Sequence, residues 1–444
     1  VLESDPDEHE LPRNDVPTVV RMSGSGREFV LTREPSWEPC GEACVSQVAI
    51  YSSASGAPVG KTLMADGCVE AAAFSPDSNL LAVGIGPPGT GSPGRVEIRN
   101  RMGLRIKSGE IELPSGPASL AWNPLGEEIA VLCRSGEILI IKPGLESVAQ
   151  WSTASASPRS RINPMVAYTP DGLTLVSLGP DGAIEIRESS SGDLRHPPME
   201  SLPDGFWSFA LSRDSRYMVT ATINGAVAGW DLERGTLAGG VLQHPSWVYR
   251  CHFSPNQNYL VTASHDGKVR LWDWRSGVIV GSPMVHPSEV YDAVFTPDDR
   301  WLLTACRDGN VRVWEPLTGQ LLAPPVKVGQ QAFNIEITGD GSQAVIGTLG
   351  KDVVILSLAV LQEKSPFTAE ELCLVGEVIS GCIIQQGSIR DLTTSEWMER
   401  YERIRVLHKD AFQAGHGYGL KKLVVEKTAV VPEVVRFSNP EQGD

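Results

Sequence analysis

Two stretches of this chain decide its fold: HPSWVYRCHFSPNQNYLVTASHDGKVRLWDWRSG (244–277) and HPSEVYDAVFTPDDRWLLTACRDGNVRVWEPLTG (286–319). They align without a gap at a shift of 42 residues. A period of this length indicates an array of equivalent supersecondary units. Length alone would suggest about three domains for 444 residues, so the repeat replaces that expectation with one repeating architecture.

Each well-formed unit predicts four short β-strands. In the first stretch and its continuation these cover 249–254, 259–264, 269–274 and 278–284. The segments are rich in β-branched and aromatic residues. Asp266-Gly267 lies between the second and third strands, where glycine supplies the positive φ of a hairpin turn. Four antiparallel strands in about 42 residues are typical of one blade of a β-propeller, and the fold class is all-β.

An apolar residue followed by Ser or Thr and then a turn pair marks each unit. The apolar members are Met22, Phe74, Trp122, Tyr168, Leu211, Phe253, Phe295 and Ile337. Eight units therefore fill residues 17–358. We expect eight blades, closed by an N-terminal strand that pairs with the last sheet so that no edge stays exposed. Seven blades result if part of the first unit completes the last one, and a closing blade upstream of Val1 is a third arrangement.

The repeats resemble the WD-repeat (WD40) β-propeller family. Trp230-Asp231 and Trp272-Asp273 carry the family dipeptide, and Trp314-Glu315 is an altered copy. The resemblance implies a structural hydrogen-bond set at His244, Ser264, Asp266 and Trp272, and in the next unit at His286, Asp308 and Trp314, with Cys306 where Ser is expected. The preceding unit keeps Thr222 and Trp230 but has Asn224 in place of Asp, and earlier units have Arg99, Ile141 and Arg187 near the Trp position.

The same resemblance implies which positions face a partner. These flank the valine of the first strand and precede the turn aspartate. The partner-binding residues expected here are Trp207, Trp247, Tyr249, His265, Glu289, Tyr291 and Arg307. Large aromatic side chains with an arginine on a rigid rim are typical of interface hot spots. The alternative is that several of them pack between blades.

Charge and cysteine usage narrow the classes of partner and compartment. With 38 basic and 54 acidic residues the net charge is −16, which disfavours nucleic-acid binding and favours a protein or peptide partner with a basic or neutral surface. The longest apolar stretch, within 353–361, is too short to span a bilayer, so no membrane insertion is expected. Eight scattered cysteines predict a cytoplasmic location. The oligomeric state stays open.

Three motifs that resemble chemistry are better explained by the repeat. Residues 84–89, GIGPPG, match a dinucleotide loop but are followed by a strand rather than a helix. Residues 55–62, SGAPVGKT, are one residue short of a phosphate-binding loop and align with fourth strands of other units. Cys40 and Cys44 lack the second ligand pair of a structural zinc site. We therefore expect no cofactor, no metal and no catalytic residues.

The remainder divides into an acidic N-terminal segment (1–16), the propeller (17–358) and a C-terminal extension (359–444). Helical patterns cover 370–380 and 393–407, with 415–444 expected to be irregular. ELCLVGEVISG (371–381) and LTTSEWMERYERIR (392–405) resemble bacterial WD-repeat regions that follow serine/threonine kinase domains. That resemblance implies a kinase domain upstream of Val1, although no kinase motif lies within the chain.

These observations predict a non-catalytic protein–protein interaction scaffold. It would serve as the sensor or substrate-recruiting part of a kinase-linked signalling protein. One alternative is an enzyme whose active site lies at the central channel, where several Asp, Glu or His side chains would have to converge. The other is a purely structural repeat domain with no partner of its own.

Overall fold

The computed structural model describes residues 18–33, 45–86, 93–102, 110–144, 146–152, 164–200, 206–349, 352–358, 382–385, 388–391, 393–407 and 434–438. The chain divides into two compact units, one made of Val1–Ser357 with Glu433–Asp444 and the other of Leu358–Pro432. Cys40 and Cys44 lie outside the described residues.

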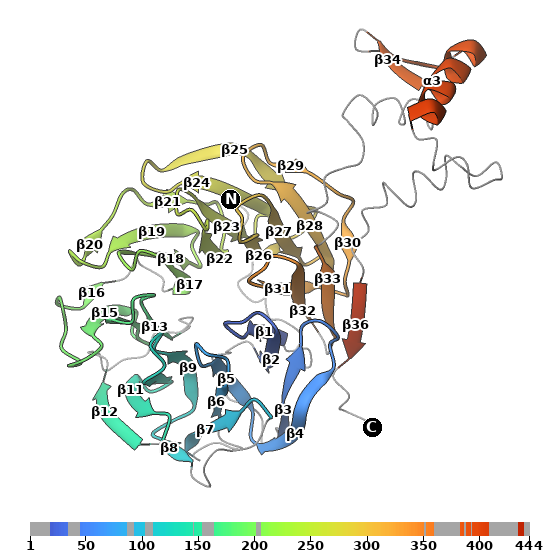
Figure 1. Cartoon of the computed structure of the whole chain (residues 1–444). Coiled ribbons are helices and arrows are strands. Elements are labelled where there is room, and N and C mark those ends of the chain that lie inside the picture. The colour runs from blue at the N-terminus through green and yellow to red at the C-terminus, as the bar shows by residue number, and fades with distance from the viewer. Residues whose placement is uncertain are drawn as a thin grey trace, which may run out of the picture. The chain divides into compact units, whose positions relative to one another are not determined.

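The first unit is an eight-bladed β-propeller, which confirms the expected fold class and blade number (Figure 1). Blades 1 to 4 follow chain order and are each a four-stranded antiparallel sheet. Their strands are β1 (Thr18–Met22), β2 (Glu28–Arg33), β3 (Val45–Ser52) and β4 (Pro58–Asp66); β5 (Val69–Phe74), β6 (Leu80–Ile85), β7 (Gly94–Asn100) and β8 (Ile111–Leu113); β9 (Pro117–Trp122), β10 (Ile129–Cys133), β11 (Glu137–Lys142) and β12 (Glu146–Ser152); and β13 (Met165–Tyr168), β14 (Thr174–Leu178), β15 (Ala183–Glu188) and β16 (Met199–Glu200).

Blades 5 to 7 follow the same order and blade 8 departs from it. Their strands are β17 (Phe206–Leu211), β18 (Tyr217–Thr222), β19 (Ala226–Asp231), β20 (Thr236–Leu237) and β21 (Leu242–Gln243); β22 (Val248–Phe253), β23 (Leu260–Ser264), β24 (Lys268–Asp273) and β25 (Val278–Val285); β26 (Val290–Phe295), β27 (Leu302–Cys306), β28 (Asn310–Glu315), β29 (Gln320–Leu321) and β30 (Val326–Lys327); and β31 (Ala332–Ile337), β32 (Gln343–Thr348), β33 (Asp352–Ser357) and β36 (Val434–Ser438).

The closure of the ring differs from the expected one. β36, near the C-terminus, pairs antiparallel with β33 and is the fourth strand of blade 8. The N-terminal strand β1 instead pairs with β2 inside blade 1. The expectation that an N-terminal strand completes the last sheet is therefore wrong, and residues 415–444 contain a strand where none was expected.

Eight equivalent turns join the first and second strands of the blades. In each, the fourth residue of the turn has a positive φ, at 60° to 78°. The eight positions are Gly26, Ser78, Gly126, Gly172, Ser215, Gln257, Asp299 and Gly341. In six of the turns the leading Ser or Thr hydroxyl donates to the Asp or Asn side chain two residues on. This local motif is the physical content of the repeat signature in the sequence.

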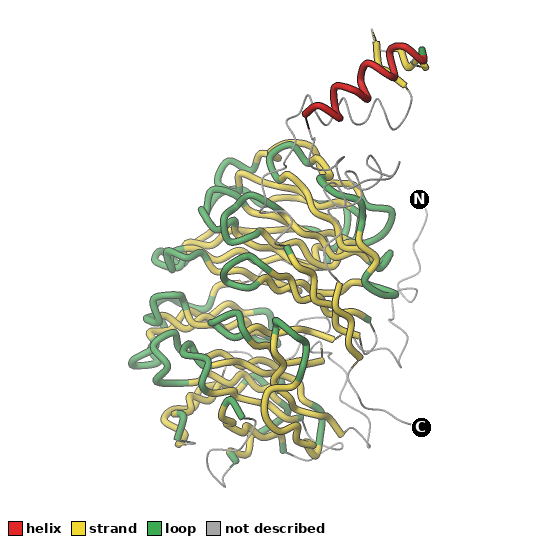
Figure 2. The backbone as a smooth tube through the Cα atoms, turned by 45° about the vertical axis from the view of Figure 1, so that its right-hand side comes forward, coloured by secondary structure: helices red, strands yellow, loops and turns green. Residues whose placement is uncertain are grey.

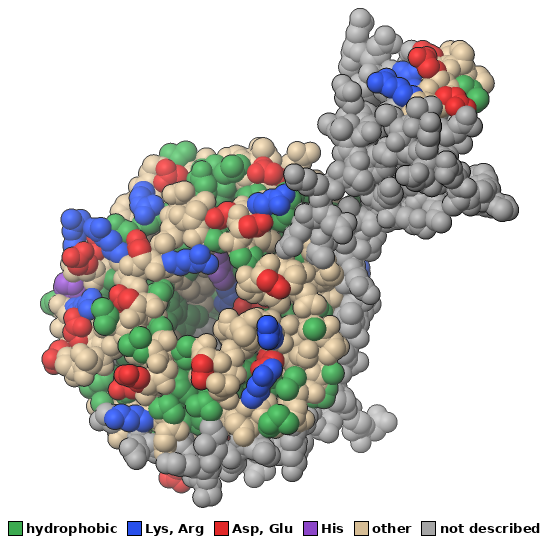
Figure 3. Space-filling view, in the orientation of Figure 1, with side chains coloured by type: hydrophobic (Ala, Val, Ile, Leu, Met, Phe, Trp, Pro, Cys, Tyr) green, Lys and Arg blue, Asp and Glu red, His purple; other side chains and the backbone are tan. Residues whose placement is uncertain are grey.

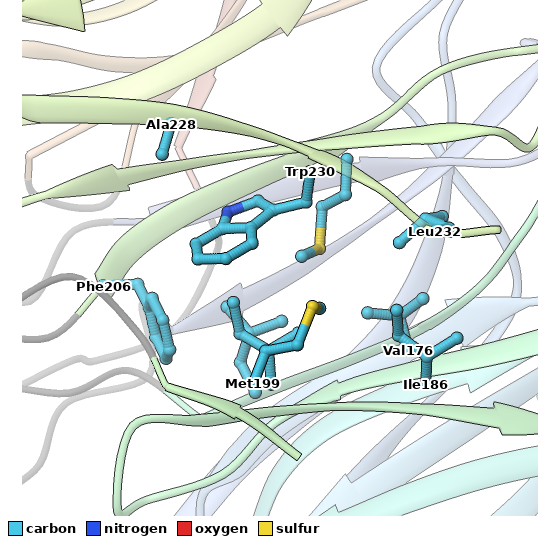
Figure 4. Close-up of a cluster of buried hydrophobic side chains, with 10 residues drawn as sticks. Val176, Ile186, Met199, Phe206, Ala228, Trp230 and Leu232 are labelled. Atoms are coloured by element: carbon cyan, nitrogen blue, oxygen red, sulfur yellow. The ribbon is translucent and has the colours of Figure 1, made fainter. Parts of the chain in front are cut away.

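The hydrophobic core lies between neighbouring blades rather than within one. Figure 4 shows the cluster between blades 4 and 5. Val176, Ile186 and Met199 come from blade 4, and Phe206 and Trp230 come from blade 5. Each sheet is buried on both faces, so its middle strands read as nearly continuous apolar runs instead of alternating patterns. The tube in Figure 2 shows the strands stacked blade upon blade.

In the second unit the described residues are a hairpin, β34 (Cys382–Gln385) with β35 (Ser388–Asp391), and the helix α3 (Thr394–Leu407). Thr393 caps the helix, because the backbone N–H of Glu396 donates to its hydroxyl at 3.3 Å while its own N–H donates to the Glu396 carboxylate at 2.9 Å. The helix expected at 393–407 is confirmed. The helix expected at 370–380 lies outside the described residues.

Among the cysteines, Cys68 is disulfide-bonded. Cys133, Cys251 and Cys306 are free and buried. Burial raises the pKa of the Cys251 thiol to about 12, so this side chain behaves as a small apolar residue rather than as a nucleophile.

Candidate interaction surface

The blade tryptophans are held by a threonine two residues before the hydroxyl expected from the sequence. The indole of Trp272 donates to the Thr262 hydroxyl at 2.9 Å. In blade 7 Trp314 donates to Thr304 at 3.0 Å, and in blade 5 Trp230 donates to Thr220 at 2.9 Å. The assignment of Ser264, Cys306 and Thr222 to this position is therefore corrected. Residues two apart on a strand share a face, so the pattern alone did not separate them.

Ser264 and Cys306 have a different structural task. The Ser264 hydroxyl donates to the backbone carbonyl of Trp247 at 2.8 Å, and the Cys306 thiol makes the equivalent contact with Ser288 O at 3.5 Å. Each ties the end of the second strand to the loop that leads into the first strand of its own blade. In blade 6 that loop carries Trp247, so Ser264 fixes the backbone of an expected binding residue.

The two histidines of the set are buried and neutral. His286 shares a hydrogen bond with Thr304 at 2.8 Å through Nε2, and in the other blade the Arg270 guanidinium lies 2.9 Å from His244 Nδ1. Burial, reinforced by the nearby arginine in each blade, lowers the pKa of both rings to about 4. They stack edge-on or tilted against Trp272 and Trp314 at 5.4 and 5.1 Å.

The turn aspartates bind arginines rather than the histidines. Asp266 pairs with Arg270 at 2.6 Å and Asp308 with Arg312 at 2.5 Å. Burial by itself would raise the pKa of Asp308, but the Arg312 guanidinium and the Asn310 side chain hold that pKa well below its usual range. The aspartate expected in the set thus anchors the hairpin turn through a charge-assisted pair.

Blades 2 and 4 replace the tryptophan set with buried ion pairs. Arg99 and Arg187 stand at the Trp position, as the sequence indicated, and each pairs with a glutamate two residues earlier on the same strand. Arg99 lies 2.6 Å from Glu97 and Arg187 lies 3.0 Å from Glu185. Both glutamates are fully buried. The partner carboxylates were missed in the sequence, although an R-x-E spacing of two on a buried strand is a signal that could have identified them.

Five aromatic side chains form a continuous row across blades 5 to 8, which we name the aromatic band: Trp207, Trp247, Tyr249, Tyr291 and Phe333. Trp207, Trp247 and Tyr249 form a triangle with ring centroids 6.2, 6.3 and 6.4 Å apart. Tyr249 then contacts Tyr291 at 5.0 Å, and Tyr291 contacts Phe333 at 5.1 Å. Such offset and edge-on pairs are favourable contacts that hold the rings in place.

A polar group borders the band. The Tyr249 hydroxyl and His265 Nδ1 share a hydrogen bond of 2.9 Å. His265 lies 3.9 Å from the Glu289 carboxylate, which also pairs with Arg307 at 2.6 Å. The structure therefore brings together all seven residues that the sequence predicted for this surface, from three different repeats.

Their exposure separates contact residues from packing residues. The Arg307 side chain is 50% exposed, and Trp207 and Trp247 are half-buried. Tyr291 is only 7% exposed and packs with Phe333 between blades. Burial raises the pKa of Tyr291 to about 12, so it stays a neutral phenol. The band therefore offers a partner its tryptophan end, while its Tyr291–Phe333 end belongs to the core.

The inner strands of the blades surround a central hollow, visible in Figure 3 with basic and histidine side chains along part of its wall. On this wall His252 lies 3.1 Å from Asp292, whose other oxygen accepts the backbone N–H of Ile335 at 3.0 Å. The pair thus links blades 6, 7 and 8. Burial would raise the pKa of Asp292, but the His252 hydrogen bond holds that pKa below its usual value.

The channel wall also carries a link between the last and first blades. The Asn334 side chain accepts the N–H of Val20 at 3.0 Å and donates to its carbonyl at 3.2 Å. Asp292 and Asn334 therefore bind backbone groups of the next blade. Within the described residues no group of three or more His, Cys, Asp or Glu side chains is arranged to hold a metal ion.

Comparison with known proteins places this geometry in a family. The family model "WD domain, G-beta repeat" matches residues 238–273 and 278–315, the segments that carry the Trp272 and Trp314 hydrogen-bond sets. The chain is a WD40-repeat β-propeller. WD40 propellers are generally non-catalytic scaffolds that bind other proteins.

Other comparisons bear on the fold of this WD40 propeller alone. The comparison with curated proteins gave no match. A crystal structure of the computationally designed Ika8 protein is similar, with 18% sequence identity and a TM-score of 0.58 over 76% of this chain and 94% of that one. In the described part of the propeller chain, no helix is long and apolar enough to cross a membrane.

Proposed function

We propose that this chain is a non-catalytic interaction scaffold whose partner binds at the tryptophan end of the aromatic band. The observation that supports this most is the convergence of seven side chains from three repeats into one connected surface. Trp and Arg at a rim held rigid by blade packing are what a hot spot requires, since little side-chain entropy is lost on binding. The net charge of −16 favours a protein or peptide with a basic or neutral contact surface over a nucleic acid.

The second part of the proposal concerns context. We assign the propeller to the sensor or substrate-recruiting region of a kinase-linked signalling protein, on the resemblance of residues 371–381 and 392–405 to bacterial WD-repeat regions downstream of kinase domains. The test is to determine the native polypeptide upstream of Val1. A serine/threonine kinase domain there supports the assignment, and an unrelated upstream region overturns it.

An enzyme at the channel has weaker support. His252, Asp292 and Glu336 do lie on inner strands of three successive blades, but Asp292 is 3% exposed and both its oxygens are engaged by the protein itself. A group committed to three hydrogen bonds is poorly placed to act on a substrate. We therefore assign the pair a structural task.

A cytoplasmic location is also proposed. The free thiols of Cys133, Cys251 and Cys306 agree with it, whereas the disulfide at Cys68 is the observation that opposes it. Alkylation of the protein in intact cells, followed by mass spectrometry, decides the matter. A reduced Cys68 supports the cytoplasm, and an oxidised Cys68 overturns it.

The binding surface is tested by site-specific photo-crosslinking in the native host, with a photoreactive phenylalanine analogue at position 247. A defined crosslinked protein that disappears when Trp207→Ala and Arg307→Ala are added supports the proposal. The matched control places the same analogue at Trp301, which follows the turn at the opposite end of the blade 7 hairpin. Crosslinks that are equal at both positions, or unaffected by the two substitutions, overturn it. Tyr291 is avoided because its loss would disturb blade packing.

A further inference from the structure

Blade 8 obtains its outermost strand in an unusual way. In the other seven blades the fourth strand begins no more than 11 residues after the third strand ends. In blade 8, β33 ends at Ser357 and β36 begins at Val434, 77 residues later. The intervening residues, Leu358–Pro432, form the second compact unit. The strand that completes the ring is therefore separated from its blade by a whole structural unit.

The edge that β36 covers is long and regular. Five residue pairs join the two strands, from Asp352↔Ser438 to Leu356↔Val434. The four β33 residues from Val353 to Leu356 are at most 2% exposed. On its other side β33 pairs with β32. Without β36, one edge of β33 would present a row of unsatisfied N–H and C=O groups over five residues, which is a template for another strand.

We propose that this edge of β33 is a β-strand docking site, that β36 occupies it as a separable ligand, and that the β36 segment of a second copy of this chain can take its place. Backbone pairing supplies most of the affinity in such strand addition, and VVRFS is rich in residues that favour strands. The inference is independent of the aromatic band.

The tether makes this strand the most exchangeable one in the ring. Effective concentration falls roughly as the −3/2 power of the connecting length, so a 77-residue connection holds β36 at an effective concentration about 60-fold lower than the five-residue connection between β24 and β25. A covalently continuous blade therefore resists exchange, whereas blade 8 accepts a competing strand at attainable protein concentrations.

The first experiment measures docking on the full chain. The probe is a fluorescent peptide of residues 432–440, PEVVRFSNP, added to the wild type and to the full chain carrying Val435→Pro and Arg436→Pro. Two consecutive prolines ensure that one falls on a position whose N–H pairs with β33. We expect the variant, whose own strand is released, to bind the peptide at least tenfold more tightly than the wild type. Equal affinity for both proteins overturns the proposal, as does equal binding of a peptide with the same two prolines.

The second experiment keeps both strands intact, in case the proline variant does not fold. Full chains with Val354→Cys and with Arg436→Cys, register partners across the two strands, are mixed and mildly oxidised. A disulfide between positions 354 and 436 of different copies, identified by mass spectrometry and increasing with protein concentration, supports exchange. The control pair is Val269→Cys with Met284→Cys in blade 6. Absence of the 354–436 linkage between copies, or an equal yield from the control, overturns the proposal.

Discussion

The backbone N–H of Asn256 in blade 6 donates to the Asp299 side chain in blade 7 at 3.3 Å. Three other interfaces repeat this contact, from Ser25 to Ser78, Asp171 to Ser215 and Asp214 to Gln257. In every case the accepting side chain belongs to the positive-φ residue of a turn. A non-glycine residue is strained there, and the inter-blade hydrogen bond offsets that strain. The four blades with glycine at this position have the relaxed backbone but lack the side chain.

Asp299→Ala should lower the free energy of unfolding by about 1–2 kcal/mol, because the strained φ of 62° remains while the hydrogen bond is lost. Asp299→Asn should be close to neutral, since its amide oxygen still accepts the Asn256 N–H and asparagine tolerates this conformation. Urea denaturation measures both. Equal destabilisation by the two changes would show that the inter-blade contact contributes nothing.

Thr262→Val should destabilise the propeller by about 1–3 kcal/mol, because it leaves the buried indole N–H of Trp272 without an acceptor. Ser264→Ala should leave the Trp272 indole bond intact and instead loosen the Trp247 loop. Indole N–H exchange followed by NMR separates these effects. Fast exchange of Trp272 in the Ser264 variant, with slow exchange in the Thr262 variant, would contradict the assignment.

Arg187→Met should cost about 3–5 kcal/mol, because Glu185 would remain as a fully buried, unpaired carboxylate. The change also removes the guanidinium that lies 5.6 Å from the Trp151 ring of blade 3. The double variant Arg187→Met with Glu185→Leu should recover most of the loss. A double-mutant cycle from thermal unfolding measures the coupling, and purely additive effects would rule out the ion pair as the cause.

Stability should fall as the pH drops from about 6.5 towards 4, because His244 and His286 have pKa values of about 4 when folded. The unfolded chain binds their protons first in this window, so unfolding gains up to about 3 kcal/mol per histidine. The contribution is fully present above pH 6.5. His286→Gln should flatten the profile between pH 4 and 6.5, as measured by urea unfolding at each pH. An unchanged slope would mean that His286 is not buried neutral.

Much of the ring could be predicted from the sequence because its determinants are local. Each blade's hairpins depend on turn residues a few positions apart, so the eight signature positions from Met22 to Ile337 were enough to count blades. The aromatic band followed from equivalent positions in successive repeats. Residues that occupy the same place in neighbouring blades must meet once the blades are stacked.

Contacts between distant residues were not accessible in the same way. Thr262 and Ser264 lie on one face of one strand, and only the packing of Trp272 decides which hydroxyl it bonds. The exposure of the band was likewise undetermined, since Tyr291 and Trp247 are similar in pattern but only Tyr291 is enclosed by its neighbour Phe333.

By itself the sequence determined the all-β repeat, the number of blades and the residues that gather at the aromatic band, because period-two strands and short turns are encoded within about 42 residues. Only the tertiary structure decided how the ring is completed. Pairing of β36 with β33 joins segments 77 residues apart, and such pairing depends on an open sheet edge, which no local pattern records.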